Sequence, residues 1–115
     1  MTVLLAPNFS CLGRLVHSHF VSARSEYDSE FCNAISKITD RFRKGDWGDI
    51  PEEDKQLNID TITAEKSGNP GGTLMGSYMT DCPNPVKIYI MTSGYGNQYY
   101  GADYCYTTVL YPEEY

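Results

Sequence analysis

The chain has 115 residues, of which 41% are hydrophobic and 21% charged, and its formal net charge is −6. This length suits one domain, residues 1–115, and the composition excludes wholesale disorder. The excess of acids argues against a general nucleic-acid binder, and no apolar run approaches the roughly 18 residues that a membrane span needs. Because Met1–Ala6 lacks the basic flank of a signal peptide, we expect a cytoplasmic protein with no membrane contact.

The first half of the chain predicts two helices after one or two short strands in Met1–Ala6 and Leu12–Phe20. The first helix spans about 25–44, because apolar residues recur there at helical spacing and Gly45 follows as a stop. These residues are Phe31, Ile35, Ile38 and Phe42. Ser25 and Asp28 resemble a capping box at its start.

A second helix is predicted over about 50–66. Asp49 is the expected N-cap and Pro51 falls in the first turn. A modest apolar stripe is expected on this helix at Leu57, Thr61 and Ala64. The glycine- and proline-rich residues 68–72 end it.

The second half is predicted to be strands, at about 73–80, 86–92 and 104–111, because β-branched and aromatic residues are concentrated there. In the middle strand Ile88 and Ile90 alternate with Tyr89 and Met91, which indicates a central strand with both faces partly covered. The predicted fold class is α+β: two helices followed by a three-stranded antiparallel β-meander in a single domain, with the longer helix on one face.

The densest group of carboxylates lies around the start of the second predicted helix, where residues 45–66 hold seven acids and two bases. Such acids commonly stabilise a helix N-terminus, but a concentrated acidic surface can also occupy a basic site built for DNA or RNA. Trp47, between two glycines, is either a hydrophobic plug or an interface anchor. The candidate partner-binding residues here are Asp46, Trp47, Asp49, Glu52, Glu53 and Asp54.

A tyrosine- and glycine-rich segment, residues 93–103, separates the last two predicted strands. Its composition resembles that of adaptable binding loops, so Tyr95, Tyr99 and Tyr100 are further candidate anchors for a partner. The alternative is a long hairpin loop whose tyrosines fold back on the sheet.

Motifs for nucleophilic catalysis are lacking in this sequence, and no catalytic residue or cofactor is predicted. His17 and His19 alternate, so on a strand their rings would share a face and could hold a metal, although nothing nearby completes the site. A small metal-dependent hydrolase using Asp46, Asp49 and Glu53, with His17 or His19, remains the alternative function.

Four segments together resemble a family of small, functionally uncharacterised proteins of bacterial plasmids, phages and integrative elements. The segments are Leu12-Gly13-Arg14-Leu15-Val16; Gly45-Asp46-Trp47-Gly48-Asp49 with Glu53-Asp54 and Asn58; Ile88-Tyr89-Ile90-Met91-Thr92; and Thr107-Thr108-Val109-Leu110-Tyr111-Pro112-Glu113-Glu114-Tyr115. The tyrosine-rich segment departs from the family pattern, which has a short turn there.

The resemblance implies a mobile-element setting but no activity. With the small acidic domain, it predicts a non-enzymatic inhibitor that binds a host defence complex in the bacterial cytoplasm, of anti-CRISPR or anti-restriction type. The expected partner is a nucleic-acid-binding protein, without direct nucleic-acid contact by this chain. A regulatory module of plasmid maintenance is a further alternative.

Overall fold

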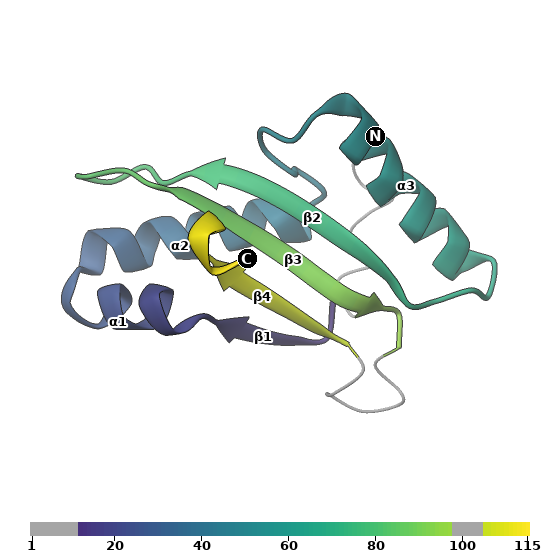
Figure 1. Ribbon diagram of the computed structural model, residues 1–115, viewed down its shortest axis with the longest axis horizontal. Helices are drawn as coiled ribbons and strands as arrows, with labels where there is room; N and C mark the ends of the chain where they lie inside the picture. Colours follow the sequence, from purple (N-terminus) through teal and green to yellow (C-terminus); the bar gives the residue numbers. More distant parts are fainter. Residues whose placement is uncertain (1–11, 98–104) are drawn as a thin grey trace.

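The computed structural model describes residues 12–97 and 105–115, which form three α-helices and a four-stranded mixed sheet (Figure 1). Their order is β1 (Arg14–His17), α1 (His19–Tyr27), α2 (Ser29–Arg43), α3 (Glu52–Lys66), β2 (Gly72–Met79), β3 (Lys87–Tyr95), β4 (Tyr106–Leu110) and the short 3-10 helix η3 (Pro112–Glu114). The predicted α+β class is confirmed. Within the described residues, no helix has both the length and the apolar character to cross a bilayer.

The sheet has the order β1-β4-β3-β2. Strands β2, β3 and β4 form the predicted antiparallel meander, and β3 is an inner strand with Ile88 and Ile90 buried. The predicted three-stranded sheet is incomplete, because β1 adds a fourth strand parallel to β4. That pairing joins the two ends of the described chain, which no local pattern reveals.

The predicted helix 25–44 is two helices with a break at Asp28. Asp28 has an extended backbone (φ −125°, ψ 94°), and its side chain accepts a hydrogen bond from the Phe31 N–H at 3.0 Å. Asp28 therefore caps α2 at its N-terminus, whereas Ser25 lies inside α1 and is no cap. Strand β1 ends at His17, and residues up to Phe20 that were expected to continue it begin α1 instead.

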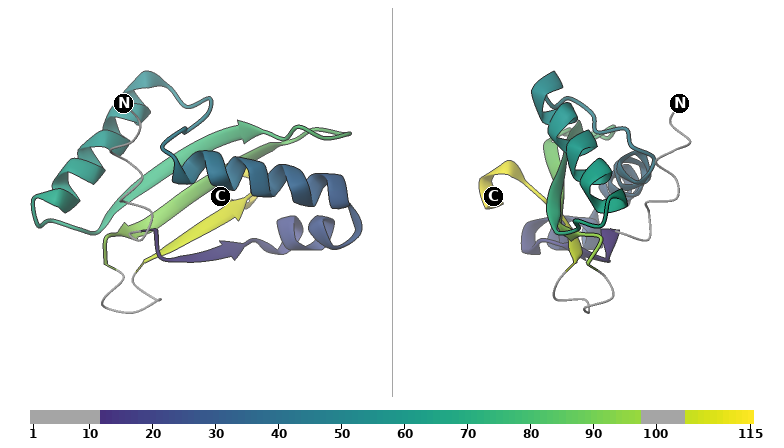
Figure 2. Two further views of the ribbon diagram at one scale, coloured as in Figure 1. Left: turned by 180° about the vertical axis from the view of Figure 1, so that it is seen from behind. Right: turned by 90° about the vertical axis from the view of Figure 1, so that its right-hand side faces the viewer.

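Helix α2 contributes a large share of the hydrophobic core. Its buried face includes the four residues predicted from helical spacing, Phe31, Ile35, Ile38 and Phe42, and lies across one face of the sheet (Figure 2). Among the described residues, η3 lies against the opposite face of the sheet, directly after β4 (Figure 2). Burial of this stripe is the main source of stability for the helix, because propensity alone contributes little.

Helix α3 lies beside β2, at the edge of the sheet (Figures 1 and 2). Two predictions about it are wrong. Its N-cap is Pro51 rather than Asp49, and no side chain caps it. Its buried residues are Asn58 and Ile62, while Leu57, which was placed on the apolar stripe, is 60% exposed. The helix is turned so that a polar residue faces the sheet.

Candidate functional site: the acidic corner

The candidate site is the acidic corner, which we define as the α2–α3 connection (residues 44–51) and the first turn of α3. Its shape depends on a turn that pairs with the outer edge of β2. The Ser77 N–H donates to the Trp47 carbonyl at 3.1 Å, and the Asp49 N–H donates to the Ser77 carbonyl at 2.8 Å. Gly48 forms a parallel bridge with Ser77, so the connection is a one-residue extension of the sheet.

Gly48 is required by this close approach. Its φ is +72°, and a Cβ built on it would lie 2.0 Å from the Ser77 carbonyl oxygen. A side chain at this position would collide with the strand as well as strain the backbone. Trp47 beside it is 8% exposed and belongs to the hydrophobic core. The ring is a plug, and as folded it is not displayed to a partner.

Asp46 is held by neighbouring groups on both sides of the turn. Its carboxylate accepts hydrogen bonds from Arg41 Nε at 2.7 Å, from Arg41 Nη2 at 3.2 Å and from the Gly48 N–H at 3.1 Å. These bonds, chiefly those from Arg41, lower the pKa of Asp46 below its ordinary value against the opposing effect of partial burial. The charge of Asp46 is therefore largely balanced within the chain.

Tyr78 fixes the same turn from the sheet. Its hydroxyl donates to the Asp46 carbonyl at 2.8 Å, and the Arg41 guanidinium lies 5.0 Å from its ring centroid. Burial raises the pKa of Tyr78 well above its ordinary value. The hydroxyl thus stays a proton donor to the turn throughout the neutral range.

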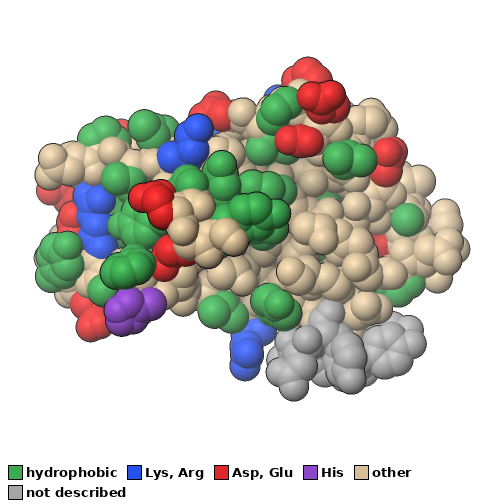
Figure 3. Space-filling view, in the orientation of Figure 1, with side chains coloured by type: hydrophobic (Ala, Val, Ile, Leu, Met, Phe, Trp, Pro, Cys, Tyr) green, Lys and Arg blue, Asp and Glu red, His purple; other side chains and the backbone are tan. Residues whose placement is uncertain are grey.

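The acids left for a partner are those that follow the turn. Asp49, Glu52 and Glu53 are exposed and Asp54 is half-buried, and Lys55 pairs with Glu52 at 3.3 Å. Figure 3 shows acidic side chains gathered at the upper side of the molecule, over α3. The corner thus places three exposed carboxylates, those of Asp49, Glu52 and Glu53, close to the N-terminus of α3, next to a turn that is hydrogen-bonded to β2.

The other predicted site residues do not join this corner. Tyr95 ends β3 with its side chain fully buried, so it is no exposed anchor, and Tyr99 and Tyr100 lie outside the described residues. His17 ends β1 and His19 begins α1, so the single strand that would align their rings is absent. In residues 12–97 and 105–115, no three His, Cys, Asp or Glu side chains converge as a metal site.

Sequence reasoning missed the role of Asn58. It is 3% exposed, its Nδ2 donates to the Met75 carbonyl at 2.8 Å, and its Oδ1 accepts from the Met75 N–H at 3.1 Å. The available signal was an asparagine four residues before Ile62, on the buried stripe of a helix.

Comparison with known protein families, curated proteins and solved structures finds no match to this chain.

Proposed function

We propose that this chain is a non-enzymatic accessory protein of a mobile genetic element. In this proposal it binds a host defence complex, of anti-CRISPR or anti-restriction type, through the acidic corner. The observation that carries the proposal is the exposure of three neighbouring acids: Asp49, on a turn that is hydrogen-bonded to β2, and Glu52 and Glu53, in the first turn of α3. The resemblance of the motifs to a mobile-element family supplies the setting.

The electrostatics of the corner support a basic partner. Seven acids and two bases lie in residues 45–66, against a net charge of +2 in residues 1–44. Carboxylates presented this way can occupy a site that normally receives phosphates, and they also steer association. Because the turn is fixed by backbone hydrogen bonds to β2, little ordering entropy would be lost when the partner binds.

The experiment compares two charge-reversal variants with the same change in net charge. The first is Glu52→Lys/Glu53→Lys in the acidic corner, and the control is Glu26→Lys/Glu30→Lys, two exposed acids on α1 and α2. Each protein is produced in bacteria that carry a CRISPR or restriction system and are then challenged with phage or plasmid DNA.

We expect the unaltered chain and the control to protect the incoming DNA and the corner variant to lose protection while staying folded. Exposed acids at a helix N-terminus contribute only about 0.3–1 kcal/mol each to stability, whereas interface charge pairs couple by about 1.5–7 kcal/mol. Failure of the unaltered chain to protect against every system tested would overturn the proposal. Equal protection by the corner variant would place the contact surface elsewhere.

A further inference from the structure

The two edge strands of the sheet differ in whether their outward-facing backbone groups are hydrogen-bonded. Along the outer edge of β2, Asn58 occupies both backbone groups of Met75, and Thr61 Oγ1 donates to the Thr73 carbonyl at 3.1 Å. Ser77 is paired with the turn between α2 and α3. The backbone groups at alternate positions of this edge are therefore occupied, which prevents another strand from pairing there.

The outer edge of β1 is open among the described residues. In the parallel pair with β4, the Arg14 N–H donates to the Cys105 carbonyl at 3.4 Å and the Ser18 N–H donates to the Val109 carbonyl at 2.9 Å. Alternate residues of a strand present their backbone groups to opposite sides. The N–H and C=O of Leu15 and His17 consequently point away from the sheet, and no described residue pairs with them.

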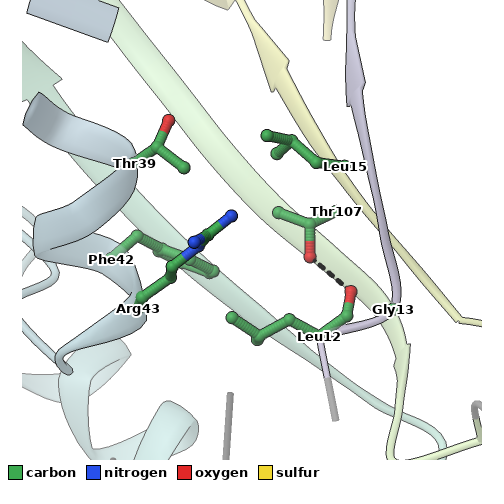
Figure 4. A pocket seen from close by; sticks show the side chains of 7 residues that line it. All are labelled: Leu12, Gly13, Leu15, Thr39, Phe42, Arg43 and Thr107. Atoms are coloured by element: carbon green, nitrogen blue, oxygen red, sulfur yellow. Dashed lines mark hydrogen bonds between the residues drawn. The ribbon is translucent and has the colours of Figure 1, made fainter. Parts of the chain in front are cut away.

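A groove runs between this edge and α2. It consists of two hollows of about 250 and 190 Å³, both lined by Leu15, Thr39 and Arg43. Leu12 and Phe42 add apolar wall to the first hollow and Ile35 to the second. Figure 4 shows the Arg43 side chain extending from α2 into the space in front of Leu12 and Leu15. Arg43 forms no ion pair with any described residue.

The charged residues that line the groove indicate which kind of segment could bind there. Arg43 lies within the groove, and among the described residues Asp40 is the only acid that lines either hollow. Burial lowers the pKa of His17, so its ring adds no charge there near neutral pH, and Arg14 lines neither hollow. A second copy of the chain, paired β1 to β1, would present only Arg14, Leu15, Val16 and His17, and none of these supplies a carboxylate to Arg43. A strand that carries a carboxylate on its groove side would instead pair with Arg43.

We propose that β1 accepts an extended acidic–apolar segment of another protein as a fifth strand. The backbone of that segment pairs with Leu15 and His17, one apolar side chain enters the hollow beside Leu12 and Phe42, and a carboxylate two residues away meets Arg43. This is strand addition at an exposed sheet edge, in which backbone hydrogen bonds supply affinity and alternate side chains supply specificity. The surface is separate from the acidic corner and takes a partner of opposite charge.

The test uses the full chain labelled with ¹⁵N and the capped peptide Ser-Thr-Leu-Thr-Glu-Thr-Ser, whose Leu and Glu lie on one side of a strand. Binding should slow the amide hydrogen exchange of Leu15 and His17 at least tenfold. The same peptide with Lys in place of Glu is the control ligand. A third peptide, methylated on the backbone nitrogens that face β1, should not bind.

Two variants separate the groove from general electrostatics. Arg43→Glu should weaken binding of the Glu peptide at least tenfold and improve binding of the Lys peptide. Lys37→Glu, an exposed site on the same helix that lines neither hollow, should change neither by more than about twofold. Both altered side chains are exposed, so both variants should fold.

Four results would overturn the proposal. Leu15 and His17 amides already protected in the free monomer would mean that another part of the chain occupies the edge. Protection together with a dimeric mass in solution would assign the edge to a second copy. Unchanged amide exchange of Leu15 and His17 at saturating peptide would show that the segment does not pair with β1. Equal affinity of Arg43→Glu and the unaltered chain for the Glu peptide would show that Arg43 does not recognise the carboxylate.

Discussion

Asn58 and Met75 are joined by two hydrogen bonds, in which the side-chain amide of a helix residue stands in for the backbone of a neighbouring strand. The donor and acceptor of Asn58 match the C=O and N–H of Met75, so one side chain occupies both groups of an edge position. This gives the asparagine of the Gly-Asp-Trp-Gly-containing segment a structural role.

Replacing Asn58 should therefore destabilise the protein. Asn58→Ala leaves the Met75 N–H and C=O without these partners at a part-buried site, at a cost of about 1–3 kcal/mol for the unsatisfied groups. Urea denaturation followed by circular dichroism measures the change in the free energy of unfolding. Gln56→Ala, an exposed position on the same helix, is the control and should change it by less than about 0.5 kcal/mol. Equal losses for the two variants would contradict the role assigned to the amide.

Gly48 and Gly68 offer a matched pair for measuring the cost of close approach. Both have positive φ, +72° and +90°, but a Cβ on Gly48 would lie 2.0 Å from the Ser77 carbonyl oxygen, while one on Gly68 would meet nothing within 4 Å. Gly68→Ala should cost about 1–2 kcal/mol from backbone strain alone. Gly48→Ala should cost at least about 2 kcal/mol more, measured by the same denaturation. A difference near zero would show that the turn can move away from β2 freely.

The ion pair between Asp46 and Arg41 predicts a dependence of stability on pH. The pKa of Asp46 is lowered in the folded state, so the stabilisation is present above the unfolded value, about 4, and is lost as the pH falls through the lower folded value. The side chain of Asp46 is 52% exposed, which limits the effect to about 1 kcal/mol or less. Asp46→Asn should therefore be less stable than the unaltered chain at pH 7, and the gap should close towards pH 3. A gap that stays constant over that range would contradict this.

Glu114 connects the C-terminal end of the described chain to the start of α1. Its Oε1 accepts from Ser18 Oγ at 2.6 Å and from the Tyr111 N–H at 2.9 Å, and Ser18 is also the N-cap of α1. Ser18→Ala should cost about 0.5–2 kcal/mol. Combining it with Glu114→Ala should cost less than the sum of the two, with a coupling of about 0.5–3 kcal/mol. Glu113→Ala, the exposed neighbour, should show no coupling to Ser18 in the same double-mutant cycle.

Local patterns predicted the elements whose partners lie close in the sequence. The stripe of α2 and the alternation in β3 are periodic and long enough to identify, and both are confirmed. Helix α1 buries only Val21, so it has no stripe to detect, and its junction with α2 depends on the extended backbone of Asp28. Strand β1 has four residues and pairs near the opposite end of the chain.

The acidic corner was recognised by composition. Which of its residues are paired or buried within the chain, and which are exposed, was not predictable in the same way. Asp46 and Arg41 are five residues apart across a helix end, a spacing that carries no standard expectation of contact. Trp47 and Tyr95 are aromatic residues in glycine-rich surroundings, which suits either a core plug or an exposed anchor. Their burial depends on how β2 and β3 are placed, and that is a property of the whole sheet.

The pairing of β1 with β4 also constrains how the protein is made. Synthesis delivers β1 and α1 first, yet β1 pairs with β4 and the Ser18 cap meets Glu114, 96 residues later. Translation proceeds at about 5–20 residues per second, so helix α2 and the hairpin of β2 and β3 can assemble before β4 is available to pair with β1. Closure of that long loop is slow compared with local pairing, so we expect β4 to join β3 and β1 only after α2 and the β2–β3 hairpin have formed.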